Sequence, residues 1–417
     1  MHGASRLHIH DIAIAVRRLS SPYLQFILFR AYSLMSIATE SHAPVVKYRE
    51  GTLTSALRWL IAALFVATPL NPYISDMTVY LWLPLVFLDF QFLARLKKVT
   101  LKPTLFILLF LSFCLLIGRI DIAVKGAAIS LGVIYLIKVG KPIVNKIFVC
   151  LVFSALWCVL QFIAFQFGQE YSAMLGPSAI STLIWGAYAT ETYTNQYVVF
   201  FLPRMSGLSR EAGFFVSLLL ITFIIRARDK KLTKKEILVF ILAFMFSLSK
   251  VSLVLFIFLF LYLLRHYIRK IPVNITIITF IFLSVCLAHY LNVGSPDYFY
   301  GHESFAHRFS PSYLLTDMKL PNLLFGCDRE YQCFNSSQPI IGFFEPKGLK
   351  PNIGLSGILV EMGVFGLVTI FLASVLLKLD SYDMGILICF TQTVTLFTVD
   401  SFIILTYYYI ITNKQYR

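Results

Sequence analysis

Charged residues are scarce in this 417-residue chain, and acidic residues are the scarcest of them. Asp, Glu, Lys and Arg make up 14% of the sequence, with 21 acidic residues against 36 lysines and arginines, while hydrophobic residues make up 58%. Together with a mean hydropathy of +0.77, this composition excludes an ordinary soluble globular domain. Strand-like alternation of apolar and polar residues is also lacking, which argues against a transmembrane barrel. The sequence therefore predicts an all-α protein of membrane-spanning helices.

Cysteine is sparse as well, with seven residues in the chain. Cys327 and Cys333 share one polar loop and can form a disulfide if that loop faces an oxidising compartment. No CxxC or Cys/His spacing typical of a metal site occurs, and we expect neither a metal nor a cofactor. The other five cysteines lie in apolar runs and are expected to pack as small hydrophobic side chains: Cys114, Cys150, Cys158, Cys286 and Cys389.

Repeated apolar runs of about 18–20 residues predict a polytopic membrane protein with about twelve crossings. Two further apolar stretches, 237–264 and 384–412, are too long for one upright helix. The remaining candidate spans cover residues 53–70, 77–94, 101–118, 120–137, 147–167, 212–226, 272–291 and 354–377.

Basic residues recur in short loops between these runs, so the net charge of +15 marks membrane orientation rather than nucleic-acid binding. The positive-inside rule places the basic loops in the cytoplasm. An even number of crossings must then separate the loops at 226–235 and 265–270. We therefore predict that 237–264 folds into two short arms with a tip near Ser247–Lys250, and that 384–412 folds about Val399–Asp400. The alternative is one long tilted helix in each stretch.

The chain divides into an N-terminal segment, 1–50, and a polytopic membrane domain, 51–417. The first segment has three open interpretations: an interfacial helix, a weak extra span, or the product of a start site placed too far upstream. The membrane domain carries two large loops on the predicted outer face, 168–211 and 292–352. The second loop has nearly balanced charge, with five Lys/Arg against six Asp/Glu, as expected outside.

The first of these loops ends in the sequence Arg-Met-Ser-Gly-Leu-Ser-Arg-Glu-Ala-Gly, residues 204–213. Arg204 and Arg210 offer forked donors suited to phosphate oxygens, and Gly207 permits a tight backbone turn. Glu211 stands where a helix begins and can orient a neighbouring arginine. The turn can hold an anionic lipid headgroup; the alternative is that its arginines only mark the membrane interface.

Two further cations are candidate site residues. Lys250 lies in the middle of an apolar stretch, where a charge costs about 2.5–3.5 kcal/mol and should face the bundle interior or an aqueous cavity. Arg308 is the first cation of the second outer loop, with a solvated loop charge as the alternative. His307 can act as a base, although spacing does not single it out. Asp121 is expected to pair locally with Arg119 or Lys125.

These residues resemble the bacterial superfamily of O-antigen polymerases and O-antigen ligases, and the match covers about residues 190–375. Residues 204–214 resemble the family's Arg-x-Ser-Gly-x-x-x-Glu-Pro stretch, and 247–252 resemble its Ser-Arg segment. Residues 352–366 resemble the segment after the large loop, with Arg308 and Leu324-Phe325-Gly326 upstream. Three residues depart from the pattern: Ala212 replaces a proline, Lys250 replaces an arginine, and Asn352 stands where ligases carry a histidine.

The resemblance implies a GT-C-like helical bundle in the inner membrane with a large periplasmic loop. The implied reaction polymerises undecaprenyl-pyrophosphate-linked repeat units, donor and acceptor, without a metal, at a site facing the periplasm. The implied partners are these lipid-linked glycans, membrane lipid and a regulator of chain length. Catalytic roles fall to Arg204, Arg308 and Glu211, with Glu211 and His307 as candidate bases, and the pyrophosphate partners are Arg204, Arg210, Lys250 and Arg308. An O-antigen ligase, a flippase or transporter of the same lipid, and a non-catalytic subunit are the alternatives.

Overall fold

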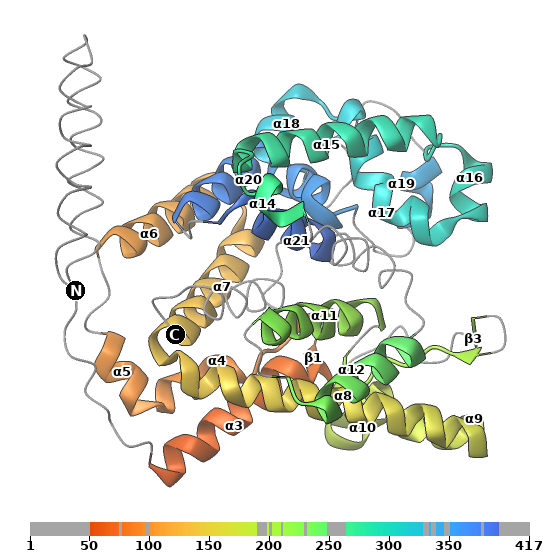
Figure 1. Ribbon diagram of the computed structural model, residues 1–417. Coiled ribbons are helices and arrows are strands. Elements are labelled where there is room, and N and C mark those ends of the chain that lie inside the picture. Colours follow the sequence, from red (N-terminus) through yellow and green to blue (C-terminus); the bar gives the residue numbers. More distant parts are fainter. Residues whose placement is uncertain are drawn as a thin grey trace. The chain divides into compact units, whose positions relative to one another are not determined.

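A computed structural model describes most of the chain from residue 51 onward (Figure 1). The chain divides into two units, Met1–Gly51 and Thr52–Arg417, and every helix and strand reported below belongs to the second. The predictions for 1–50 lie outside the described residues. The structure describes residues 51–74, 77–96, 101–189, 198–199, 202–209, 212–228, 232–247, 264–327, 333–334, 339–345, 351–376 and 379–391.

The second unit is α-helical, as the composition predicted. The strands within the described residues are two short antiparallel pairs, β1 (Tyr73–Ile74) with β2 (Met77–Thr78), and β3 (Val198–Val199) with β4 (Leu202–Pro203). The helices are α3 (Thr52–Val66), α4 (Trp82–Leu85), α5 (Phe90–Leu96), α6 (Leu101–Leu116), α7 (Ile120–Val139), α8 (Lys141–Phe167), α9 (Gln169–Met174), α10 (Pro177–Trp185), α11 (Ala212–Arg228), α12 (Lys234–Ser247), α14 (Arg265–Ile268), α15 (Val273–Tyr290), α16 (Pro296–Gly301), α17 (Glu303–Leu314), α18 (Leu320–Phe325), α19 (Pro339–Phe344), α20 (Gly354–Leu376) and α21 (Ser381–Thr391).

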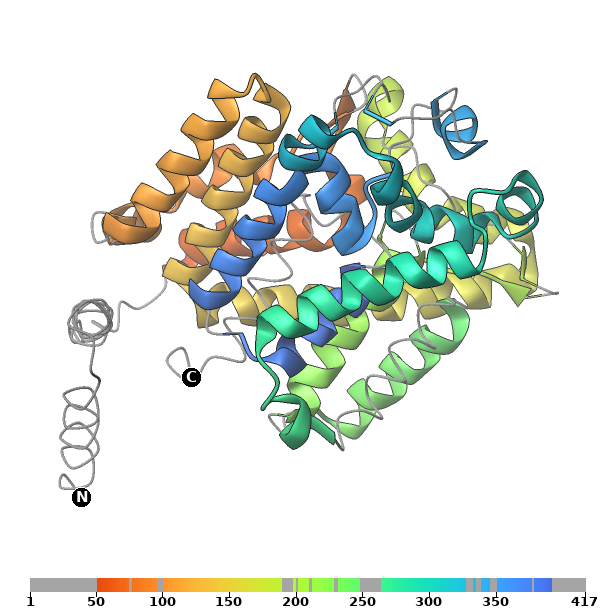
Figure 2. The same cartoon turned by 90° about the horizontal axis from the view of Figure 1, so that it is seen from above.

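Four of the described helices are long and apolar enough to cross a membrane: α7, α8, α15 and the Gly354–Leu372 part of α20. They coincide with four of the predicted spans. Shorter apolar helices cover Thr52–Val66 and Thr104–Leu116, and Figure 2 shows α6 beside α7, with which it is in contact. The chain is thus a membrane-embedded helical protein, and the number of twelve crossings stays a prediction.

The predicted span 77–94 was wrong as a continuous helix. The chain there forms β2, the short α4, a 3-10 turn at Val86–Leu88 and α5. Asp89, fully buried at the break, accepts a hydrogen bond from the first turn of α5 at Phe92 N (3.1 Å). Its carboxylate also forms an ion pair with buried Arg58 on α3, with Nε–Oδ2 at 2.7 Å and Nη2–Oδ1 at 3.1 Å. A carboxylate buried in an apolar interior needs such donors, and the chain leaves the helix to supply them.

Three polar contacts join helix ends that lie far apart in the sequence. Arg95 donates to the carbonyl of Lys138 at 2.8 Å, joining the ends of α5 and α7 that were predicted to be cytoplasmic. Arg269 and Asp380 form an ion pair at 2.8 Å, which joins two further ends predicted on that side. At the opposite end, Arg119 in the α6–α7 turn donates to the carbonyl of Cys327 in the second predicted outer loop.

The two predicted outer loops contain folded structure. The stretch 168–211 holds α9, α10 and the β3–β4 pair, and 292–352 holds α16 to α19. The second stretch contributes Leu314, Ile340 and Phe344 to an apolar core that also includes Ala288 of α15 and Val360 of α20. Cys327 and Cys333 are joined by a disulfide at its edge.

Candidate functional site

The arginine turn, which we define as Arg204–Ser209, joins strand β4 to the approach to helix α11. Ser209 N donates to Ser206 O at 3.1 Å, which closes a tight turn about Gly207 at a φ of +57°. Met205, Ser206 and Ser209 are buried although they belong to a connecting segment. A buried turn must place its backbone polar groups on partners, because an unpaired one is costly.

Helix α8 supplies those partners. The Gln161 side chain accepts from Gly207 N and donates to Gly207 O, both at 3.0 Å, so that it holds this peptide from both sides. Gln161 also donates to Leu175 O at 2.8 Å, and Ser154 Oγ accepts from Leu208 N at 3.0 Å. Ser154 and Gln161 are seven residues apart and therefore share one face of α8. The turn is clamped onto this face.

Only glycine fits at position 207. Its positive φ is unfavourable for other residues, and the backbone lies directly on α8. A Cβ atom there would lie 2.7 Å from Ser154 O and 2.8 Å from the ring of Phe215. The close approach explains why the motif has glycine at this position.

The same turn contacts the end of helix α12. Met205 N donates to Phe246 O at 3.1 Å, and the rings of Phe162 and Phe246 stack at 3.8 Å. Helix α12 is described as far as Ser247, and the rest of the predicted tip, 248–250, lies outside the described residues. The turn therefore lies against the residues that lead to Lys250. Lys250 lies outside the described residues, as do Arg210 and Glu211 and the second predicted arm.

Among the described residues, two polar side-chain atoms of the turn are buried and have no hydrogen-bond partner: Arg204 Nε and Ser209 Oγ. Leaving a buried donor unsatisfied costs about 1–3 kcal/mol, and more for a charged group. Native structures rarely tolerate such groups, and each one calls for an explanation. A guanidinium N–H and a hydroxyl O–H in one clamped turn are a donor set that suits an anion with several oxygens.

Arg308 lies half-buried on α17. One turn further along, Ser312 Oγ donates to Ser356 Oγ at 2.8 Å and fixes α17 to the first turn of α20. Asn352, just before α20, lies four residues before Ser356, the same spacing that separates Arg308 from Ser312. The contacts thus assign Arg308 to the α17–α20 pair and Arg204 to α8 and α12. The rings of His307 and Phe344 are in contact, with their centroids 5.0 Å apart, and the role of His307 as a base stays a prediction.

A charged cluster lies at a kink in α20, and sequence reasoning assigned it no role. Gly363, with φ +62° and ψ −155°, interrupts the helix, so carbonyl groups before it are free to accept other donors. Glu361 O accepts from Arg119 Nη1 at 3.0 Å, and Glu361 Oε1 pairs with Lys125 Nζ at 3.1 Å. Arg119 Nε also pairs with Asp121 at 3.3 Å, which confirms the local pairing predicted for Asp121.

Two of the segments that carry the family resemblance meet at this kink. Helix α18 packs on α20, and a Cβ atom at Gly326 would lie only 2.2 Å from Glu361 O. In the other direction, a Cβ atom at Gly363 would lie 2.5 Å from the backbone of Leu324. Cys327 N donates to Val360 O at 2.7 Å and extends the contact. The disulfide-bonded segment is therefore fastened to the kinked helix.

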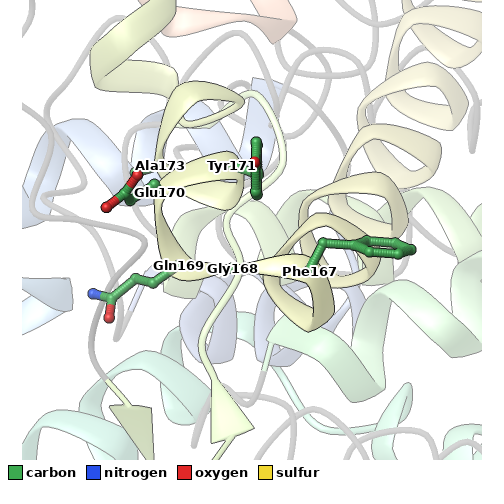
Figure 3. A pocket seen from close by; sticks show the side chains of 6 residues that line it. All are labelled: Phe167, Gly168, Gln169, Glu170, Tyr171 and Ala173. Carbon is green, nitrogen blue, oxygen red and sulfur yellow. The ribbon is translucent and has the colours of Figure 1, made fainter.

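A surface hollow of about 510 Å³ lies at the α8–α9 junction but involves none of these groups. It is lined by one continuous stretch, Phe167–Tyr171 with Ala173, and Figure 3 shows the side chains of Phe167, Gln169 and Tyr171 pointing in different directions. Side chains that diverge in this way do not assemble a binding site. We therefore keep the arginine turn as the candidate site.

Sequence reasoning found the arginine turn but missed its supports. A polar pair with helical spacing inside an apolar run, as in Ser154 and Gln161, is the signal that could have pointed to the clamp. Glu361 was visible as a carboxylate within a predicted span, which is itself a signal of function or pairing. In the described ranges, no three His, Cys, Asp or Glu side chains come together as metal ligands.

Comparison of the chain with models of protein families, with curated proteins and with solved structures gives no match.

Proposed function

We propose that this protein is an integral membrane glycosyltransferase that joins lipid-linked oligosaccharide repeat units into a surface polysaccharide of the O-antigen type. The substrates are two undecaprenyl-pyrophosphate-linked glycans, a donor and an acceptor. The reaction takes place on the periplasmic face of the inner membrane and needs no metal. A protein that sets chain length is a candidate partner.

One observation carries the proposal: Arg204 Nε and Ser209 Oγ are buried and have no partner within the described part of the chain, in a turn that α8 holds by hydrogen bonds. The turn precedes an apolar helix, α11, in a membrane-embedded chain. An anionic lipid headgroup brings phosphate oxygens to this position from the bilayer. Pyrophosphate supplies enough acceptor oxygens for a guanidinium and a hydroxyl together.

The chemistry follows from the bond that must break. An acceptor hydroxyl oxygen bonds to the anomeric carbon of the donor glycan, the bond from that carbon to the pyrophosphate oxygen breaks, and the hydroxyl proton passes to a base. Negative charge grows on the departing lipid pyrophosphate. Fixed cations aimed at it stabilise the transition state more than the ground state. We assign this role to Arg204 and Arg308, with Arg210 and Lys250 as further pyrophosphate partners and Glu211 as a candidate base.

Asn352 favours a polymerase over a ligase, because the position aligned with the ligase histidine carries no imidazole. The alternative outside the enzymes is a flippase, a transporter of the same lipid-linked glycan. Internally repeated halves with broken helices at matching positions would favour it, and the sequence has no such symmetry. The second outer stretch, which holds helices α16 to α19, is also longer than a simple gate requires.

The test replaces Arg204 by Gln and by Lys in cells and scores the glycan ladder on a gel at matched protein level. We expect Arg204→Gln to abolish long chains and Arg204→Lys to retain part of the activity. Lys270→Gln, which removes one positive charge from an exposed position, is the control and should leave the ladder unchanged.

Two outcomes would contradict the proposal. A normal ladder in Arg204→Gln would remove the turn from the site. Single repeat units that accumulate on the cytoplasmic face of a deletion strain, rather than on the outer face, would identify a flippase.

A further inference from the structure

A second cavity borders the arginine turn and is lined in part by Val149, Cys150 and Phe153 of α8. It has a volume of about 400 Å³, within the usual range of ligand pockets. Helices α3, α8 and α10 form its walls, and Leu208 of the arginine turn closes part of it. Its lining is made of aliphatic and aromatic side chains and one cysteine, and includes Trp59, Ala63, Val149, Phe153, Ile180 and Leu208.

The cavity is open to the apolar surface of the protein. Three side chains at its edge are large, apolar and exposed: Trp59 (41%), Val149 (49%) and Phe153 (52%). In a membrane-embedded chain such side chains face lipid. An apolar cavity does not hold ordered water, because water needs polar partners. The fitting occupant is therefore a hydrocarbon chain that enters from the bilayer.

The position of the cavity relative to the arginine turn specifies which hydrocarbon chain. Ser154 holds Leu208 N, and Val149 lies five residues earlier on α8, which is about 7–8 Å along the helix axis. Leu208 belongs to both features. A lipid whose anionic head occupies the donors of Arg204 and Ser209 would thus have its first chain segments beside the cavity.

The donors of the arginine turn and the apolar lining of the cavity together favour one molecule with an anionic head and a long hydrocarbon chain. We propose that the cavity between α3, α8 and α10 holds the isoprenoid chain of the polyprenyl-pyrophosphate substrate. This inference rests on the proposed function and adds to it a specific binding site for the lipid part. Helix α3 and its Ala63 then become determinants of substrate affinity although they are remote from the glycan.

The test uses photocrosslinking of the purified full-length protein in detergent micelles. The probe is a polyprenyl pyrophosphate with a diazirine on an isoprene unit near the head, and mass spectrometry identifies the labelled residues. We expect labels on residues that line the cavity, including Phe153 and Ile180. Excess unlabelled polyprenyl pyrophosphate should remove the labels, and phosphatidylglycerol should not.

Substitutions that fill the cavity provide a second test. Ala63→Phe should reduce labelling roughly tenfold, and Ile180→Trp should do the same from the opposite wall. Ala56→Phe is the matched control: it makes the same change on the same helix two turns away, at an exposed position outside the cavity, and should label like the wild type. Only variants with the wild-type elution profile and thermal unfolding midpoint are compared.

Three results would overturn the inference. These are labels that map away from the cavity, labelling that is unchanged in both filled variants, and equal competition by phosphatidylglycerol, which would assign the cavity to a bilayer phospholipid. The glycan ladder separates this failure from failure of the proposed function. If Arg204→Gln abolishes the ladder but the crosslinking results contradict the cavity site, the polymerase proposal stands without the isoprenoid site. If Arg204→Gln keeps the ladder, the polymerase proposal fails whatever the crosslinks show.

Discussion

Gly207 is the residue whose replacement most sharply tests the construction of the arginine turn. We consider Gly207→Ala, which adds one methyl group. Two separate costs follow from the structure: a positive φ of +57° and a Cβ atom 2.7 Å from Ser154 O and 2.8 Å from Phe215. Ordinary carbon contacts begin at about 3.5 Å, so either the turn or α8 must move.

The magnitude can be worked out from these two costs. A left-handed conformation costs a non-glycine residue about 1–2 kcal/mol, and an extra methyl in a packed interior costs about 1–3 kcal/mol. We therefore expect Gly207→Ala to lower the free energy of unfolding by about 2–5 kcal/mol in total.

Gly118→Ala isolates the conformational cost. Gly118 follows α6 with φ +76° in a Schellman-type ending, in which Arg119 N donates to Cys114 O and Gly118 N donates to Leu115 O. No atom lies within 4 Å of a Cβ built at this position. Its replacement should cost only about 1–2 kcal/mol.

The assay is thermal unfolding of both variants in the same detergent, followed by the glycan ladder in cells. We expect Gly207→Ala to unfold at a clearly lower temperature than Gly118→Ala and to lose long chains. Equal midpoints for the two variants would refute the claim that the turn is packed directly against α8.

The remaining predictions concern the clamp and the two buried charge clusters. Gln161→Leu should abolish the glycan ladder, because it removes the hydrogen bonds that this side chain makes to Gly207. The control is Gln169→Leu, which makes the same change at an exposed position. An intact ladder in Gln161→Leu would contradict the clamp. Arg58→Met should cost about 3–5 kcal/mol of stability by leaving the Asp89 carboxylate buried and uncompensated, and adding Asp89→Leu should restore part of it. Thermal unfolding of the single and double variants checks this, and additive losses would argue against the pair. Glu361→Gln should lower the free energy of unfolding by less than about 1 kcal/mol, because the side chain of its partner Lys125 is 38% exposed. A decrease as large as that of Arg58→Met would refute this prediction.

The sequence predicted those parts of the fold that depend on local composition. Helices α7, α8, α15 and α20 coincide with apolar runs, because the hydropathy and length of such a run are enough to identify a membrane-spanning helix. The break at Asp89 could not be predicted in the same way. It depends on Arg58, which lies 31 residues earlier, and hydropathy does not report such a partner. A charged pair within two apolar runs is the pattern to look for.

The candidate site was predictable in its residues but not in its construction. Arg204 and Gly207 were recognisable as an arginine and a glycine in a turn between apolar runs. That Gln161 grips both sides of the Gly207 peptide depends on which face of α8 meets the turn. The contact between Gly326 and the kink at Gly363 likewise joins residues that are distant in the chain, and only packing reveals it.

The most direct test of the central claim is reconstitution of the reaction. The purified protein is placed in vesicles with a polyprenyl-pyrophosphate-linked repeat unit, and elongated glycan and released polyprenyl pyrophosphate are both quantified. We predict that one polyprenyl pyrophosphate is released for each new glycosidic bond, and that Arg204→Gln abolishes both products while Lys270→Gln forms them normally. Release without elongation, or elongation that does not depend on Arg204, would contradict the account.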